Sequence, residues 1–143
     1  AGQVETLRNH DLLTAEQADA VDVRGLERFL ASPLAEEIRQ GSNVLREYRF
    51  TLLMDARDYD PAASERDSIL LQGVVDCCFE TDAGLTVVDF KTDHVRTAEE
   101  VAQRAEQYRP QLAAYSLALE KVLERPVVRR ALYFLNAGET VEI

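Results

Sequence analysis

Three charged side chains interrupt two apolar stretches in the middle of the chain: Asp76 in LLQGVVDCCF, and Asp89 and Lys91 in LTVVDFK. Stretches this rich in Val, Leu and Phe are typical of buried strands. Burying an unpaired carboxylate or ammonium group is costly, so these charges need partners. Two carboxylates beside a lysine are suited to a divalent metal ion and an anionic substrate.

The short segment Thr81-Asp82-Ala83-Gly84 joins the two stretches and predicts a hairpin with a four-residue loop. Symmetrical closure of that loop predicts these pairs: Glu80 with Leu85, Cys78 with Val87, and Asp76 with Asp89. Because side chains alternate along a strand, Lys91 shares the face of Asp89. A bulge, or a slip of one residue, would turn one carboxylate to the opposite face.

The predicted patch of Asp76, Asp89 and Lys91 suits Mg²⁺ or Mn²⁺, which prefer oxygen ligands. A lysine two residues from a ligand can orient an attacking water or offset the charge on phosphorus. The alternative is a buried ion cluster with a purely structural role. Gln111 and Tyr115 are four residues apart, so they share one helix face and can reach the lysine or a DNA phosphate. An ordinary amphipathic helix would show the same spacing.

Two further polar residues have open assignments. Glu47 lies in the β-rich segment VLREYRFTLLM, where alternation groups it with Leu45 and Arg49. It is either a third carboxylate near the metal or a solvated strand residue. His94 follows Lys91 by three residues and is either close to the metal or an ordinary loop histidine.

Composition limits the class of protein. A chain of 143 residues with 46% hydrophobic and 29% charged residues fits one globular domain. Its net charge of −10 argues against a free-standing nucleic-acid binder. We find no apolar run of membrane-spanning length and no signal peptide. The two cysteines, Cys77 and Cys78, are too few for a four-ligand zinc or iron–sulfur site and indicate a reduced, cytoplasmic protein.

The remaining pattern predicts the elements around the hairpin. Thr14 and Thr97 each begin a capping box, and Ser32-Pro33 begins a further helix. The predicted helices run from Thr14 to about Ala31, from Ser32 to Gly41, from Thr97 to about Tyr108, and from Pro110 to Glu124. The predicted strands, besides the hairpin, are Val44–Met54, Val127–Leu135 and Thr140–Ile143. This order predicts an α/β fold with a mixed central sheet flanked by helices.

A family resemblance rests on G-x-x-D at Gly73–Asp76, D-F-K at Asp89–Lys91 and Q-x-x-x-Y at Gln111–Tyr115, with the stretches SPLAEEI and YFLNAGE. From about Thr14 onward the chain resembles the RecB-like nuclease domains of the restriction-endonuclease-like PD-(D/E)XK superfamily. Within them it is similar to the C-terminal nuclease domain of AddA-type helicase–nuclease subunits.

The resemblance implies a restriction-endonuclease-like core and Mg²⁺-dependent hydrolysis of DNA. It also implies that Asp76, Asp89 and the Phe90 backbone carbonyl bind the metal, and that Lys91 is catalytic. Gln111 and Tyr115 would support the lysine and contact the DNA backbone. The parent protein would carry ATP-driven helicase domains and work with an AddB-type partner in double-strand break processing.

One departure concerns the metal site, because the family usually adds a histidine ligand from a helix before Thr14. The segment AGQVETLRNHDL carries no strong pattern, and His10 lies in no recognisable version of that motif. We therefore expect residues 1–143 to be one nuclease domain, a C-terminal fragment of a longer polypeptide, whose metal site lacks a ligand. A catalytically incomplete module that docks to a partner protein or to DNA is the alternative.

Overall fold

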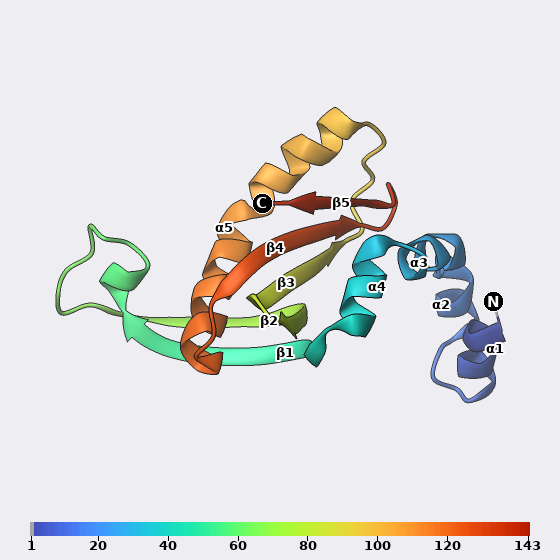
Figure 1. Ribbon diagram of the computed structural model, residues 1–143. Helices are drawn as coiled ribbons and strands as arrows, with labels where there is room; N and C mark the ends of the chain where they lie inside the picture. Colours follow the sequence, from blue (N-terminus) through green and yellow to red (C-terminus); the bar gives the residue numbers. More distant parts are fainter. Residues whose placement is uncertain (1) are drawn as a thin grey trace.

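The structure is a computed structural model and describes residues 2–143. Its elements follow in this order: α1 (Gly2–Asn9), α2 (Ala15–Ala20), α3 (Val23–Leu30), α4 (Pro33–Gln40), β1 (Ser42–Asp55), the short 3₁₀ helix η1 (Ala56–Asp58), β2 (Ser68–Thr81), β3 (Gly84–Lys91), α5 (Ala98–Leu123), β4 (Val127–Phe134) and β5 (Glu139–Glu142) (Figure 1). The predicted α/β class is confirmed.

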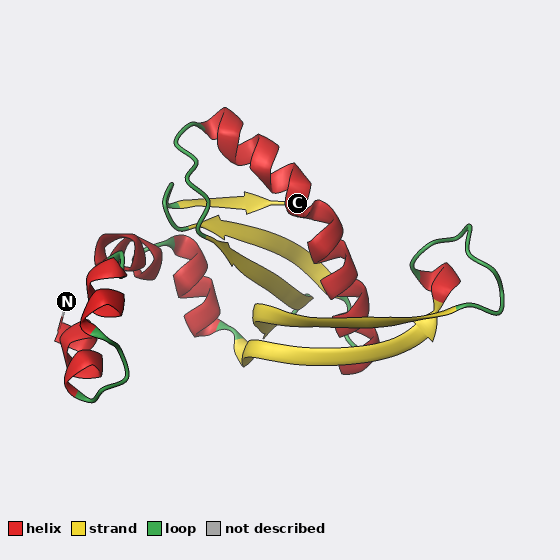
Figure 2. Cartoon of the chain, turned by 180° about the vertical axis from the view of Figure 1, so that it is seen from behind, coloured by secondary structure: helices red, strands yellow, loops and turns green. Residues whose placement is uncertain are grey.

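The five strands form one mixed sheet in the order β1-β2-β3-β4-β5. Strands β3 and β4 are parallel. The helix between them, α5, returns the chain to the end of the sheet where β3 began, so that β4 runs in the same direction. The other neighbouring strands are antiparallel. Beyond the main sheet, β1 and β2 extend as a two-stranded ribbon toward η1 and its loop (Figure 2).

Helices cover both faces of the sheet. On one face, α3 and α4 pack through Phe29, Leu34 and Ile38 against Cys77, Phe79, Val88 and Tyr133. On the other face, the α5 residues Ala118 and Leu119 pack against β2 and β3, and Leu112 packs against β4. The sheet is therefore the middle layer of a sandwich, and α5 covers the face toward which Val87 points.

The hairpin keeps the predicted register but has a tighter turn. Thr81 pairs with Gly84, which leaves a two-residue loop where we predicted four. The pairs Cys78–Val87 and Glu80–Leu85 form as predicted, yet the ladder ends at Cys77–Val88. The predicted pair of Asp76 with Asp89 is therefore not formed.

The missing pair coincides with an irregularity shared by β1 and β2. Val75 and Cys78 both pack toward α5, whereas Cys77 packs toward α4, so side-chain alternation skips at Asp76. Glu47 lies across from Asp76, between the pairs Arg46–Cys77 and Tyr48–Val75, and has a left-handed φ of 50°. Such an irregularity changes the direction in which a side chain points, here that of Asp76 where β2 and β3 separate. Our grouping of Leu45 with Glu47 and Arg49 was wrong for this reason, since Leu45 packs toward α5.

Two helix predictions were wrong in detail. The helix from Thr14 to Ala31 is two helices, because the Asp22 carboxylate accepts a hydrogen bond from the Gly25 amide and caps a new helix. Pro110 lies inside one continuous helix, α5, although proline removes a helical hydrogen bond. Buried residues on both sides of it, including Ala105 and Leu112, hold the helix together.

A helix, α1, lies before Thr14, and it contains no histidine. His10 directly follows α1 and is exposed. Among residues 2–143, no helix combines the length and the apolar character needed to cross a membrane.

Candidate active site

Asp89 and Lys91 lie at the end of β3, beneath α5. The Asp89 side chain is 5% exposed and that of Lys91 is 13% exposed, and Lys91 Nζ lies 2.5 Å from Asp89 Oδ2. Both residues point toward α5 because they alternate with Phe90, which packs on the α4 side. The sequence prediction that these two residues share one face is confirmed by this contact.

Asp89 is a carboxylate in an environment that disfavours its charge. Burial raises the pKa of Asp89, the nearby Asp76 raises it further, and Lys91 opposes both effects. Within residues 2–143, nothing offers its buried Oδ2 a hydrogen bond of ordinary geometry. Lys91 therefore supplies charge compensation, and this oxygen keeps capacity for a further cationic partner.

Asp76 occupies the gap where β2 and β3 separate. Its Oδ2 accepts a hydrogen bond of 2.9 Å from the backbone amide of Phe90, so the side chain takes the position of a missing rung of the ladder. It also lines a cavity of about 300 Å³ on the α4 side, together with Phe29, Arg46 and Phe90. Asp76 thus touches the backbone between Asp89 and Lys91 rather than facing Asp89 directly.

Gln111 and Tyr115 meet Lys91 from α5. Lys91 Nζ donates a hydrogen bond of 3.1 Å to Gln111 Oε1, and Gln111 Nε2 donates one of 2.9 Å to the Tyr115 hydroxyl. The interpretation that they form an ordinary amphipathic helix face is therefore insufficient. Tyr115 in turn packs edge-on against Phe50, with ring centroids 5.7 Å apart.

The glycine of G-x-x-D makes room for this chain of contacts. A Cβ atom at Gly73 would lie 2.9 Å from both Phe50 Cζ and Tyr115 Cε1, which is too close for carbon atoms. Gly73 therefore leaves room for the Tyr115 ring of α5 to pack closely against β2.

Sequence reasoning missed one aromatic contact of the lysine. Lys91 Nζ lies 3.8 Å from the centroid of the Tyr108 ring. Tyr108 precedes Gln111 by three residues and so shares its helix face. That spacing was the available signal, but it could be read only once Gln111 was known to face the sheet.

The other proposed residues lie apart from this cluster. Glu47 and His94 are both exposed, and within residues 2–143 no three His, Cys, Asp or Glu side chains gather as metal ligands. Glu47 lies across from Asp76 in the β1–β2 pairing, so its supporting role stays a prediction. His94 and His10 gain no support as metal ligands.

The oxygen atoms present fit a hard divalent cation. Asp76 and Asp89 supply carboxylates from opposite faces of the sheet, Asp76 from the α4 side and Asp89 from the α5 side, so the predicted patch on one face is not formed, and the Phe90 backbone lies between them. Mg²⁺ is commonly held by one or two carboxylates with water completing its coordination, so three side-chain ligands are not required. The burial of the Asp89 carboxylate, whose Oδ2 has the Lys91 ammonium group beside it but no hydrogen bond of ordinary geometry, is the observation that favours such an ion.

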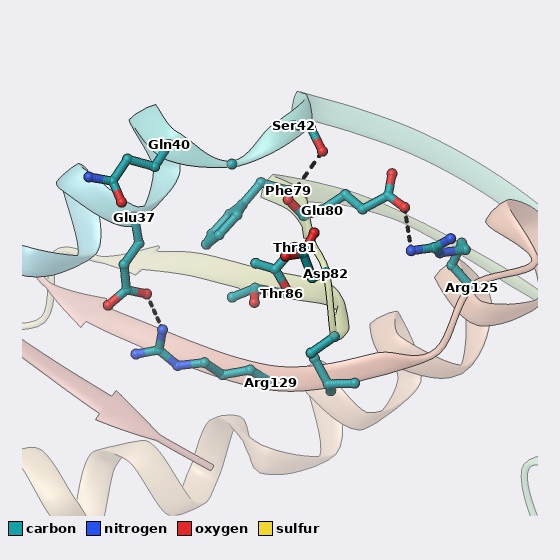
Figure 3. Close-up of a pocket in the computed structure, with 13 residues that line it drawn as sticks. Glu37, Gln40, Ser42, Phe79, Glu80, Thr81, Asp82, Thr86, Arg125 and Arg129 are labelled. Atoms are coloured by element: carbon teal, nitrogen blue, oxygen red, sulfur yellow. Dashed lines mark hydrogen bonds and ion pairs between the residues drawn. The ribbon is translucent and has the colours of Figure 1, made fainter.

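A broader cleft, of about 940 Å³, lies at the opposite end of β3. It opens beside the hairpin turn at Asp82 and Ala83, far along the strand from Lys91. Figure 3 shows four of its five charged residues already engaged with one another: Glu37 with Arg129, and Glu80 with Arg125. The size of this cleft therefore does not make it the reaction site.

Comparison with known proteins agrees with the geometry. The family model of the PD-(D/E)XK nuclease superfamily matches residues 3–142. The chain is 33% identical over 151 aligned residues to an ATP-dependent helicase/nuclease subunit of Bacillus cytotoxicus, covering 99% of this chain and 12% of that protein. It is 35% identical over 148 residues to the protein of the same name from Heliobacterium modesticaldum, covering 100% of this chain and 11% of that protein.

These relatives are far longer than the aligned region, and the chain spans about 12% of the length of the Bacillus cytotoxicus protein. The family match, in contrast, covers nearly the whole chain, including the β3 end with Asp89 and Lys91 and the α5 face with Gln111. The mixed sheet with helices on both faces is consistent with the restriction-endonuclease-like fold. The chain belongs to the PD-(D/E)XK nuclease superfamily.

Proposed function

We propose that this chain is the nuclease domain of a longer helicase–nuclease and hydrolyses DNA phosphodiester bonds as a Mg²⁺-dependent exonuclease. The observation that carries the proposal is the ammonium group of Lys91, held between the buried Asp89 carboxylate and the Gln111 amide. The superfamily match supports nuclease chemistry at this place.

Each residue has a distinct role in the proposal. Asp76, Asp89 and the Phe90 carbonyl would hold Mg²⁺, with Mn²⁺ as a substitute. When bound, the ion would polarise a phosphoryl oxygen and lower the pKa of a bound water. Lys91 would direct its remaining N–H donor toward the phosphate or the attacking water and offset negative charge there.

Gln111 and Tyr115 would keep Lys91 in place and contribute to binding the DNA backbone, and Glu47 would add a supporting contact from β1. Gln111 can do so because its carbonyl accepts from Lys91 while its amide donates to Tyr115. Lys91 is therefore oriented by one hydrogen bond to α5, whose acceptor Gln111 is itself held by Tyr115.

The proposal extends to the parent protein. The name that the relatives share, ATP-dependent helicase/nuclease, supports ATP-driven helicase domains in the same polypeptide. We propose a cytoplasmic role in DNA double-strand break repair, with an AddB-type partner protein. The net charge of −10 fits this division of labour, because the helicase domains would hold the DNA. Cys77 and Cys78 are too few to ligate an iron–sulfur cluster.

A second candidate is a nuclease-fold module that docks to a partner without cleaving DNA. It is favoured by the small donor set, since no group of three ligand-type side chains gathers within residues 2–143. The acidic composition also disfavours DNA binding by this domain alone.

Nuclease assays on the full-length polypeptide, comparing wild type with Asp89→Ala and Lys91→Ala, separate the two candidates. We expect DNA degradation to fall by about 100-fold or more in both variants, because charge stabilisation at the phosphate is lost. Helicase activity, measured in parallel, should remain and serves as the folding control. Undiminished degradation in both variants would support the docking module instead.

Metal binding can be measured on the 143-residue chain. A divalent ion that binds only the folded state raises the melting temperature, by an amount worth about 2.7 kcal/mol at 100 times its Kd. We expect Mg²⁺ or Mn²⁺ to raise the melting temperature of wild type, and to have a smaller effect on Asp76→Asn. An equal response from both proteins would place the ion elsewhere.

A further inference from the structure

Tyr108 lies against the ammonium group of Lys91, and its contacts suggest a role beyond packing. The ring centroid is 3.8 Å from Lys91 Nζ, within the range where the negative face of an aromatic ring attracts a cation. We propose that Tyr108, held by Asp93, is a positioning residue for Lys91. This inference rests on the proposed function, since it concerns the geometry of the lysine that would act on the phosphate.

The Tyr108 ring is itself fixed by a largely buried acid. Its hydroxyl lies 3.0 and 3.1 Å from the two carboxylate oxygens of Asp93 and donates to them. Arg104 Nε donates to Asp93 Oδ1 at 2.5 Å. Burial acts to raise the pKa of Asp93, but the bonds from Arg104 and Tyr108 outweigh it and the pKa lies below its ordinary value. Asp93 therefore remains a charged acceptor for Tyr108 at neutral pH.

The backbone after Lys91 is anchored as well. Asn136 Nδ2 donates hydrogen bonds to the carbonyls of Thr92 and Asp93, at 2.7 and 3.1 Å. The Leu135 amide donates to the Lys91 carbonyl at 2.9 Å. The segment that carries Lys91 and Asp93 is thus fixed to the end of β4, and Asp93 holds Tyr108 in a constant place relative to Lys91.

This arrangement addresses a property of lysine. Its ammonium group sits on a flexible stem of four carbons and rotates freely, so a single ion pair fixes its position poorly. Asp89, Gln111 and the Tyr108 ring approach Nζ as three separate contacts. Asp89 and Gln111 engage two of the three N–H donors of the ammonium group, and the ring leaves the third available because it attracts the cation without accepting a conventional hydrogen bond.

A purely structural role is the competing explanation, because Tyr108 also packs against the cluster of Val101, Ala105 and Leu112. Tyr108→Met keeps apolar volume and removes the ring, whereas Tyr108→Phe keeps the ring and removes the hydroxyl. A packing role predicts similar behaviour from both variants. A positioning role predicts that the phenylalanine variant recovers most of the wild-type behaviour.

The sequence allows a direct readout, because Lys91 and Lys121 are its only lysines. In the chain labelled with ¹³C,¹⁵N-lysine, the ring current of Tyr108 should move the Lys91 Hε resonances upfield, while Lys121, paired with Asp58, serves as the internal control. Lys91→Arg assigns the signals. The upfield shift should persist in Tyr108→Phe and disappear in Tyr108→Met. Lys91 resonances that are unchanged in Tyr108→Met would overturn the proposal.

Kinetics on the full-length polypeptide complete the test. We expect kcat to fall about tenfold in Tyr108→Met with KM for DNA nearly unchanged, and to fall less than about threefold in Tyr108→Phe. Tyr59→Met, at an exposed tyrosine in the η1 loop, is the matched control. If Tyr108→Met does not fold, Asp93→Asn decides, because it keeps the Tyr108 ring but weakens the hydrogen bonding that fixes the Tyr108 hydroxyl. An unaltered kcat and unaltered Lys91 resonances in Asp93→Asn would then overturn the proposal.

The outcomes separate this inference from the proposed function. Loss of cleavage in Lys91→Ala with full activity in Tyr108→Met would leave the function standing and remove the positioning role. Full activity in Lys91→Ala would remove the proposed function itself.

Discussion

At the scale of single residues, the site is built from charges that the surrounding sheet does not favour. Asp89 is 3% exposed and its pKa is raised by burial, so the fold is penalised for keeping it ionised. Natural sequences tolerate such groups mainly where they have partners or a function. Lys91 partly offsets the charge, and the burial of the carboxylate explains why a further cation would be a favourable addition.

The adjacent thiols give a contrasting case, because they are buried without any polar role. Burial raises the pKa of Cys78 to about 12, with Cys77 and Glu80 adding to the effect. At pH 8 only about one Cys78 in 10⁴ would be a thiolate, the reactive form. We expect neither cysteine to react with a disulfide reagent in the folded chain, and both to react in guanidinium chloride. Rapid reaction of one thiol per folded chain, measured by the coloured thiol that the reagent releases, would contradict this.

The same pKa predicts how stability changes in alkali. The thiol ionises near pH 9.0 when unperturbed but near 12 in the folded chain, so the unfolded state loses its proton first. The free energy of unfolding should therefore be unaffected by this group below about pH 9 and fall as the pH rises from there to about 12. Urea unfolding at about pH 8 and about pH 10.5 measures the fall, and Cys78→Ala should reduce it. An identical fall in both proteins would assign the effect to other groups.

At the scale of elements, the contact between β2 and α5 carries the geometry of the site. Gly73→Ala would place a methyl group 2.9 Å from both Phe50 Cζ and Tyr115 Cε1. Because the obstructing atoms belong to packed rings, we expect a stability loss of about 1–3 kcal/mol and a fall in kcat as Tyr115 moves from Gln111. Gly2→Ala, whose added Cβ would have nothing within 4 Å, is the control. Unchanged melting temperature and activity in Gly73→Ala would contradict the steric argument.

The elements also show how far sequence patterns reach. Apolar periodicity and turn residues were sufficient to predict the β2–β3 register, since Cys78–Val87 and Glu80–Leu85 follow from local turn chemistry. They could not predict where the ladder would end. At that point the Phe90 amide donates its hydrogen bond to the Asp76 side chain instead of to a backbone carbonyl of β2. The neighbouring strand β1 is irregular at the same place, since Glu47, across from Asp76, adopts a left-handed conformation.

The contacts of the lysine were predictable to a similar extent. The spacing of Gln111 and Tyr115 predicted a shared helix face, and the structure brings that face to Lys91. Tyr108 and Asp93 could not be assigned, since their relevance depends on the distance between α5 and the end of β3. Such distances arise from tertiary packing, which no local pattern encodes.

At the scale of the whole molecule, the two ends of the sheet have different roles. The end of β3 that carries Asp89 and Lys91 is polar and held by α5, whereas the hairpin-turn end is bridged by surface ion pairs. Arg129 is the centre of one such network, because its guanidinium contacts Glu37 of α4 and Glu142 of β5. It therefore connects the two C-terminal strands, β4 and β5, with α4, which is distant in sequence.

Replacing Arg129 tests whether stability and activity are separable in this fold. Arg129→Met keeps the apolar stem and removes the charge, leaving Glu37 and Glu142 exposed enough to be solvated. The side chain of Arg129 is 27% exposed, so we expect a modest loss of about 1 kcal/mol in the free energy of unfolding. Nuclease activity below the melting temperature should be unchanged, because Asp89 and Lys91 lie at the other end of β3. Arg109→Met, which breaks a pair within one helix turn, should cost less. A large loss of kcat in Arg129→Met at a temperature where the variant is folded would show that the two ends of the sheet are coupled.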